Sequence, residues 1–119
     1  MGESGISSFH DLQVYQKGYR LALEVHEMTR TLPETERYEL SSQLRRAAVS
    51  IPANIAEGYG RKNSQAEFKH FLRNALGSSN EMQVLLALVT DLGYAGATEL
   101  RTSYDELGKQ LYRLMQVWK

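Results

Sequence analysis

Hydrophobic residues recur every three or four positions along almost the whole chain, which is the spacing of one face of an α-helix. The repeat is most regular near the end, where Leu100, Tyr104, Leu107 and Leu111 alternate spacings of four and three. No stretch alternates hydrophobic and polar residues one by one, as a half-buried strand would. The pattern predicts four helices, over residues 9–32, 36–58, 65–92 and 98–118.

The residues at the ends of these segments support the helix assignment. Ser8 with Asp11, and Ser64 with Glu67, have the spacing of a capping box at a helix start. Gly58 stands where the second segment ends, and we expect it to take the left-handed conformation that closes many helices.

Pro52 lies inside the second segment, and the hydrophobic spacing continues on both sides of it. An interior proline removes a backbone hydrogen bond and costs about 3 kcal/mol. We therefore expect a kink at Pro52. We also expect the neighbouring polar residues to form a structural polar network, consisting of Arg45, Arg46, Ser50, Asn54, Glu57 and, from the third segment, Glu81.

Small side chains make the middle of the third helix thin. Gly77 in particular costs a helix about 1 kcal/mol relative to alanine, and close approach of another helix is the simplest reason for it. The second helix has its own small residues at Ala47 and Ala48. We expect the two thin regions to face each other, which brings Glu81 within reach of Arg45 or Arg46.

Four amphipathic helices with short links predict an all-α, antiparallel up-down-up-down four-helix bundle. Its size suits one domain, residues 9–119, preceded by a flexible N-terminus over residues 1–8. The number of tyrosines, together with Trp118, exceeds what such a thin bundle needs to bury. These side chains suit subunit interfaces, so we expect a homo-oligomer. They are Tyr15, Tyr19, Tyr38, Tyr104, Tyr112 and Trp118.

The composition of the chain argues against several classes of protein. The chain has 14 basic and 14 acidic residues, so it lacks the overall positive field of a strong nucleic-acid binder. It has no cysteine, which excludes disulfides and thiolate metal sites. No hydrophobic run approaches the ~20 residues of a membrane span, and no export signal precedes the first helix. We expect a cytoplasmic protein without membrane contact.

The sequence around Pro52 resembles the signature of the four-helix bundle proteins that are also called 23S rRNA-intervening sequence proteins. Further matching pieces follow in the expected order over nearly the whole chain. The pieces are residues 43–48 and 50–58, Phe9, Asp11-Leu12, Val14-Tyr15, Ser64, Glu67-Phe68, Gly77-Ser78, Glu81 and Leu92-Gly93-Tyr94.

This resemblance implies a four-helix bundle that assembles as a homopentamer. The family is also similar to the accessory variability proteins of diversity-generating retroelements, which are basic pentamers that bind a reverse transcriptase and nucleic acid. The resemblance therefore makes RNA, DNA or a reverse-transcriptase-like enzyme a possible partner.

Basic residues are unevenly distributed along the chain. Residues 36–74 carry seven basic and four acidic side chains. Four of the basic residues follow Gly58 closely, and in a ring of copies they would repeat around one rim. A rim of this kind suits contact with phosphates rather than reading of bases. The candidate nucleic-acid contacts are Arg61, Lys62, Lys69 and Arg73.

Other chemistry has weaker support. Glu67 and His70 have the Glu-x-x-His spacing of di-iron bundles, but such sites need a second copy of the motif and two further glutamates. We therefore expect no metal, no cofactor and no catalytic residues.

Two functions remain open. One is a non-enzymatic oligomer that binds nucleic acid or a nucleic-acid enzyme through its basic rim. The other is a structural or protein-interaction module without nucleic-acid affinity.

Overall fold

The computed structural model describes residues 6–94 and 96–118, and it is all-α over these ranges, with four α-helices and no strand. The bundle measures 47 × 22 × 21 Å along its principal axes. This confirms the prediction of an all-α protein with four helices. The helices are α1 (Gln13–Thr29), α2 (Leu40–Tyr59), α3 (Gln65–Asp91) and α4 (Thr98–Val117), with 3-10 turns η1 (Phe9–Asp11) and η2 (Glu34–Glu36).

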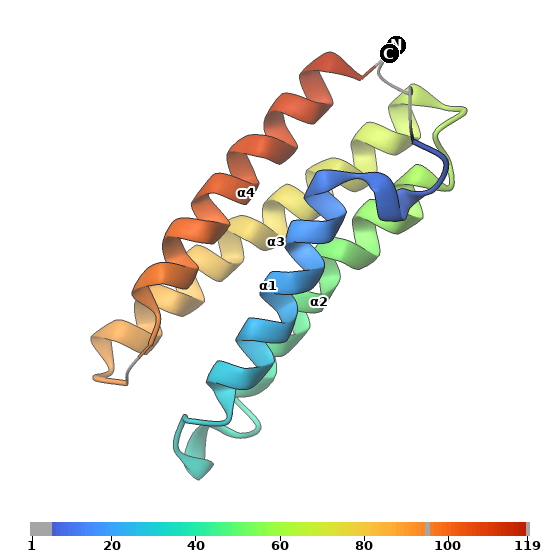
Figure 1. Ribbon diagram of the computed structural model, residues 1–119. Helices are drawn as coiled ribbons and strands as arrows, with labels where there is room; N and C mark the ends of the chain where they lie inside the picture. Colours follow the sequence, from blue (N-terminus) through green and yellow to red (C-terminus); the bar gives the residue numbers. More distant parts are fainter. Residues whose placement is uncertain (1–5, 95, 119) are drawn as a thin grey trace.

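Each helix packs against its neighbours in the sequence, and α1 also packs against α4. Figure 1 shows the four helices side by side along one long axis, with the links between them at the two ends. The hydrophobic repeat of each helix lines the shared core. Side chains that are fully buried there include Leu21 and Val25 of α1, Leu44, Ile51 and Ile55 of α2, Leu72, Met82 and Leu86 of α3, and Leu107 and Leu111 of α4.

An aromatic cluster closes the core beside the α2–α3 link. The Phe68 ring meets the Trp118 ring edge-on, with centroids 4.7 Å apart, and the Tyr59 ring lies 6.3 Å from Phe68. The Gln65 side-chain amide donates to the Trp118 carbonyl at 2.7 Å, which ties the start of α3 to the end of α4.

The first helix starts and ends inside the predicted range. Ser8 and Asp11 do form a capping box, but it caps the short turn η1, and Leu12 is extended before α1 begins at Gln13. Ser7 also donates its backbone N–H to the Asp11 carboxylate at 2.7 Å. Residues 1–5 of the predicted flexible N-terminus lie outside the described residues. At the other end α1 stops at Thr29, four residues before Pro33, which disfavours helical geometry at Leu32 and so prevents the helix from continuing to the predicted end.

The second helix begins later than predicted, at Leu40 rather than residue 36. Glu36 belongs to the turn η2 instead, and its carboxylate accepts a hydrogen bond from the Tyr94 hydroxyl at 2.9 Å. This contact ties the α1–α2 link to the α3–α4 link. The third helix fits the prediction closely: the Ser64 side chain accepts from the Glu67 N–H, and Gly93 follows the helix with a φ of +89°.

Two predictions about glycines are wrong. Gly58 is not a left-handed cap but lies inside α2, where an added Cβ would be 2.7 Å from the Phe71 Cβ. Gly77 does not mark a close helix contact, because an added Cβ there would have no atom within 4 Å. The close approaches occur instead at Gly58 and at Gly18 of α1, where a Cβ would lie 3.2 Å from Ile51 Cγ2 and 3.6 Å from Pro52 Cδ.

Candidate interaction surfaces

A hydrophobic groove with a volume of about 350 Å³ runs between α1 and α2 on the outside of the bundle, and we call it the α1–α2 groove. Its lining contains no Lys, Arg, Asp or Glu among the described residues. Leu23, Tyr19 and Val49 are 59%, 52% and 48% exposed, respectively. The groove is lined by Phe9, Tyr15, Tyr19, Ala22, Leu23 and His26 on one side and Val49, Pro52, Ala53 and Ala56 on the other.

Aromatic rings line one wall of the groove, edge-on between Phe9 and Tyr15 and stacked between Tyr15 and Tyr19. The Phe9 ring lies 4.9 Å from the Tyr15 ring, which lies 5.9 Å from the Tyr19 ring. Further along, the His26 ring nitrogen Nδ1 is 2.9 Å from the Ala22 carbonyl oxygen, so its main polar contact is within α1. The groove wall is therefore hydrophobic and already ordered by contacts within the chain.

A second exposed hydrophobic surface lies on the outer side of α3, and we call it the α3 ridge. It consists of Val84, Leu88 and Leu92, which are 62%, 43% and 53% exposed. Their spacing of four residues places them in one row along the helix. Neither surface is explained by packing within the chain.

The tyrosines predicted for interfaces divide into two groups. Tyr15, Tyr19, Tyr38 and Tyr112 lie on the surface or partly so. Tyr104, in contrast, is fully buried, and Trp118 is buried in the aromatic cluster, so these two belong to the core rather than to a surface. Both stand at core positions of the hydrophobic repeat, which is the signal that distinguishes them.

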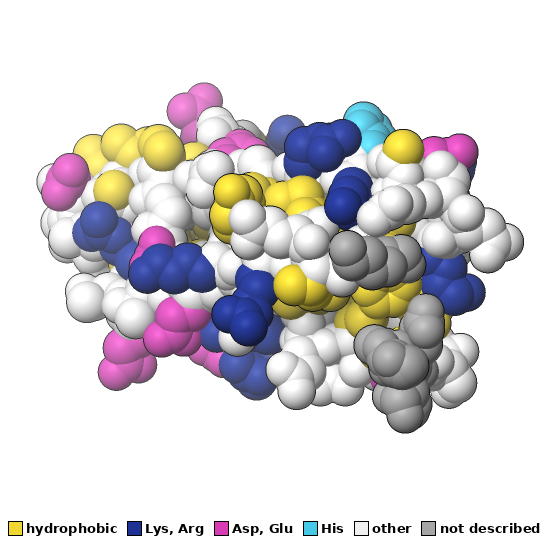
Figure 2. Space-filling view, turned by 90° about the horizontal axis from the view of Figure 1, so that it is seen from above, with side chains coloured by type: hydrophobic (Ala, Val, Ile, Leu, Met, Phe, Trp, Pro, Cys, Tyr) yellow, Lys and Arg dark blue, Asp and Glu magenta, His cyan; other side chains and the backbone are white. Residues whose placement is uncertain are grey.

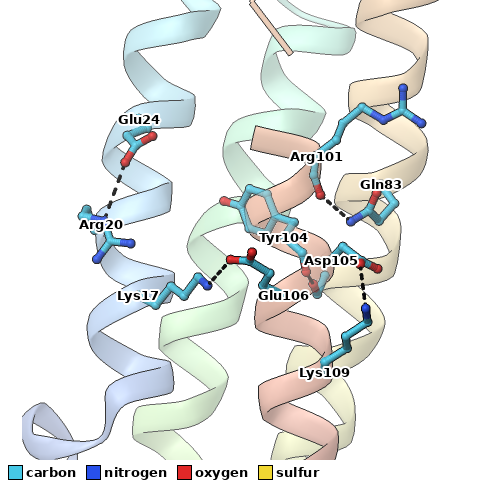
Figure 3. A network of polar contacts seen from close by, with 10 residues as sticks. Lys17, Arg20, Glu24, Gln83, Arg101, Tyr104, Asp105, Glu106 and Lys109 are labelled. Carbon is cyan, nitrogen blue, oxygen red and sulfur yellow. Dashed lines mark hydrogen bonds and ion pairs between the residues drawn. The ribbon is translucent and has the colours of Figure 1, made fainter. Parts of the chain in front are cut away.

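Tyr104 carries the one buried side-chain polar atom of the described residues that has no hydrogen-bond partner, its hydroxyl. Burial raises the pKa of this phenol. Figure 3 shows the ring beside the polar contacts that surround α4, among them the 3.0 Å ion pair between Lys17 of α1 and Glu106 of α4. Sequence reasoning did not anticipate this unpaired hydroxyl.

Arg61, the first of the predicted nucleic-acid contacts, is held by two carboxylates. Its guanidinium lies 2.8 Å from Glu57 and 3.4 Å from Glu67, and it also covers the Phe71 ring at 5.2 Å. The hydrogen bond that Arg61 donates to the Glu57 carboxylate is the main cause that raises the pKa of Arg61. Two neighbouring negative charges offset the charge of this arginine, so it is poorly placed to attract a phosphate.

Lys69 and Arg73 lie on the opposite side of α3 from Arg61. Phe71, which Arg61 covers, packs toward α2 at Gly58, whereas Leu76 packs toward α4 at Gly108. Lys69 precedes Leu76 by two helical turns, so the two share a side of the helix, and Arg73 lies between them. Neither Lys69 nor Arg73 forms an ion pair within the described part of the chain.

Lys62, the remaining candidate, has its ammonium 4.6 Å from the centre of the Tyr59 ring. The structure therefore places Arg61 on the α2 side of α3 and Lys69 with Arg73 on the α4 side, rather than in one compact patch. Figure 2 shows one face of the molecule on which Lys and Arg side chains are spread among hydrophobic and acidic ones.

Part of the predicted polar network around Pro52 is present. The Ser50 hydroxyl lies 2.6 Å from the Ser78 hydroxyl of α3 and donates to the Ala47 carbonyl at 2.8 Å. The Asn54 amide donates to the Ser50 carbonyl at 2.7 Å. The two thin regions therefore do face each other, through the two serines.

The charged members of the predicted network do not join it. Glu57 pairs with Arg61 instead. Arg46 reaches only the Ser42 hydroxyl, at 3.4 Å. In residues 6–94 and 96–118, no hydrogen bond or ion pair joins Glu81 to Arg45 or Arg46. The predicted contact between the Glu81 carboxylate and these arginines is therefore not made. The helix contact here depends on small polar groups rather than on a salt bridge.

Glu67 and His70, which have the spacing of a metal motif, point to different partners. Glu67 pairs with Arg61, and the His70 ring meets the Phe71 ring edge-on at 5.2 Å. The described residues contain no group of three or more His, Asp or Glu side chains placed to hold a metal ion. In the same residues, none of the helices has the combination of length and hydrophobicity that crossing a membrane requires.

Comparison with known proteins agrees with the helical fold. The family model described as 23S rRNA-intervening sequence protein matches residues 10–113, which is most of the chain. A search of curated proteins gives no match. The matched region contains almost all of the four helices, the whole α3 ridge and every residue of the α1–α2 groove except Phe9. The chain belongs to the family of 23S rRNA-intervening sequence proteins.

Proposed function

We propose that the protein is a non-enzymatic subunit that assembles with copies of itself in the cytoplasm. The exposed α1–α2 groove is the observation that carries this proposal. The resemblance to the family favours five copies. In this proposal the helices run up-down-up-down, and α2 bends at Pro52, which lines the groove.

The energetic argument comes from the groove residues. Leu23, Tyr19 and Val49 keep about half of their surface in water. Fully burying a large hydrophobic side chain is worth roughly 1.5–3 kcal/mol, so covering the half that each of these still exposes contributes about half of that value per residue toward a stable contact. Exposed hydrophobic patches on monomers are usually small, and larger ones mark interaction sites.

The first test replaces Leu23 by aspartate. We expect wild-type protein to scatter light as a multiple of the 13.5 kDa chain, about five in the proposed pentamer. Leu23→Asp places a charge in the groove and should reduce the mass to one chain, because an unpaired buried charge opposes association. Tyr112→Asp is the matched control and should keep the wild-type mass, because Tyr112 is exposed on α4 but belongs to neither the α1–α2 groove nor the α3 ridge, although the sequence grouped it with the interface tyrosines.

A wild-type protein that stays a single chain at high concentration contradicts this proposal. So does a Leu23→Asp variant that keeps the full wild-type mass while remaining folded. Circular dichroism of each variant separates loss of assembly from loss of helix.

A second function, contact with nucleic acid, is supported by Lys69 and Arg73. They lie on one side of α3 without an ion pair among the described residues, and a ring would repeat them around its circumference. Contacts to phosphates release counterions, so binding should weaken steeply with salt. We expect weak retention of RNA or DNA in filter binding at low salt, and loss of most of it in a Lys69→Ala, Arg73→Ala double variant.

Lys109→Ala is the matched control for that measurement, because Lys109 pairs with Asp105 at 3.3 Å. If the wild type retains no nucleic acid at low salt, the alternative function is favoured, namely a structural or protein-interaction module. The offset charge of Arg61 and the separation of the four basic residues already point in that direction.

A further inference from the structure

We infer that the α3 ridge of one copy docks in the α1–α2 groove of the next copy. This inference rests on the proposed self-assembly and names the two surfaces that meet. It makes the contact head-to-tail, since the groove belongs to α1 and α2 and the ridge belongs to α3. Repeated contacts of this kind close into a ring when the rotation between copies allows it.

The shapes of the two surfaces correspond. A helix that docks in a groove between two other helices presents hydrophobic anchors at spacings of three or four residues. The ridge from Val84 to Leu92 is about 12 Å long, and the α2 wall of the groove from Val49 to Ala56 is about 10 Å long. Ala53 and Ala56 are small, so the α2 wall leaves room for the large side chains of the ridge.

The charges beside the two surfaces are opposite. Arg45 and Arg46 precede Val49 by four and three residues, so they lie at one end of the groove on the same side of α2. Neither arginine forms an ion pair within the described residues. The hydrophobic groove therefore ends in two positive charges.

Glu81 and Asp91 occupy the corresponding places at the ridge. Glu81 precedes Val84 by three residues, and Asp91 lies between Leu88 and Leu92, so one carboxylate precedes the row and the other lies beside its last turn. Neither carboxylate is paired in residues 6–94 and 96–118. Docking in either direction along the groove thus brings a carboxylate to the arginines, which is why a second copy is the occupant that fits.

The other exposed hydrophobic side chains do not form such a row. On α4, Tyr112 and Val117 are five residues apart, which turns them about 140° away from each other. Tyr38 lies outside the helices, and the Arg37 guanidinium is 5.5 Å from its ring centre. Among the described residues outside the α1–α2 groove, the ridge is the one exposed hydrophobic row that can serve as a docking helix.

A mixing experiment tests the inference. Leu23→Asp removes the groove but keeps the ridge, and Leu88→Asp removes the ridge but keeps the groove. We expect each variant alone to be a single chain. Mixed in equal amounts, they should form a complex of two chains, twice the 13.5 kDa chain mass, because one intact ridge meets one intact groove. Tyr112→Asp mixed with either variant is the control and should assemble further, since it keeps both surfaces.

The outcomes separate this inference from self-assembly in general. If the two variants do not combine, or if Leu88→Asp assembles like wild type, the ridge is not the docking surface, although self-assembly still stands. If the wild type is a single chain, both proposals fail. Should Leu23→Asp lose its helical dichroism, Tyr19→Asp replaces it, because Tyr19 is an exposed groove residue on the same helix.

Discussion

Replacing Phe68 by alanine is expected to lower the free energy of unfolding by about 3–5 kcal/mol, the usual cost of deleting a buried aromatic ring. Phe68 is fully buried, and its ring contacts those of Trp118 and Tyr59. Removing it leaves a cavity where the start of α3, the end of α2 and the residue after α4 meet. Since small proteins are stable by only about 5–15 kcal/mol, this change removes a large part of the total.

Urea unfolding followed by circular dichroism measures the effect of Phe68→Ala. Tyr112→Ala is the matched aromatic control, because Tyr112 is 56% exposed and its removal should change stability by less than about 0.5 kcal/mol. Wild type and variants are compared at one protein concentration, because assembly adds to apparent stability. If Phe68→Ala lowered the free energy of unfolding as little as Tyr112→Ala is expected to, the aromatic cluster would not stabilise the fold.

Alanine at Gly58 is expected to destabilise the protein by about 1 kcal/mol, although alanine is the better helix former. The added methyl group would lie 2.7 Å from the Phe71 Cβ and 3.0 Å from Phe68 Cδ1, so α2 and α3 must move apart. Overpacking of this kind typically costs 1–3 kcal/mol, which exceeds the helix-propensity gain of about 1 kcal/mol.

Alanine at Gly77 should have the opposite effect and stabilise the protein by about 0.5–1 kcal/mol. Gly77 also lies inside a helix, but no atom lies within 4 Å of an added Cβ. The propensity gain is then not offset by crowding. Thermal unfolding of the two variants should therefore shift in opposite directions. A lower melting temperature for Gly77→Ala would mean that another chain packs closely there.

The helices could be predicted because each carries its own hydrophobic repeat, and the repeat of α4 runs from Leu100 to Leu111 without interruption. The ends were less predictable. Whether residue 36 continues a helix depends on the contact between Glu36 and Tyr94, which are far apart in the sequence. Local spacing contains no information about such a partner.

The candidate sites were also only partly predictable, because sequence spacing does not show which side of a helix faces which neighbour. The thin regions of α2 and α3 were expected to face each other because small residues allow helices to approach closely, and the contact between Ser50 and Ser78 shows that they do. The basic residues were grouped by their nearness in sequence, but Lys69 and Phe71 face different sides of α3. The choice between Gly77 and Gly58 as the close contact depends on the rotation of α3 against α2. That rotation is set by the packing of Phe68 and Phe71, not by the helix itself.

Trp118 is the one tryptophan of the chain, and it is buried in the cluster with Phe68 and Tyr59. The intrinsic fluorescence excited through indole therefore originates at one end of the molecule. A red shift of this emission without a loss of helicity would locate fraying at the end of the molecule where α4 finishes beside the α2–α3 link, while the opposite links at η2 and Gly93 contribute no indole signal.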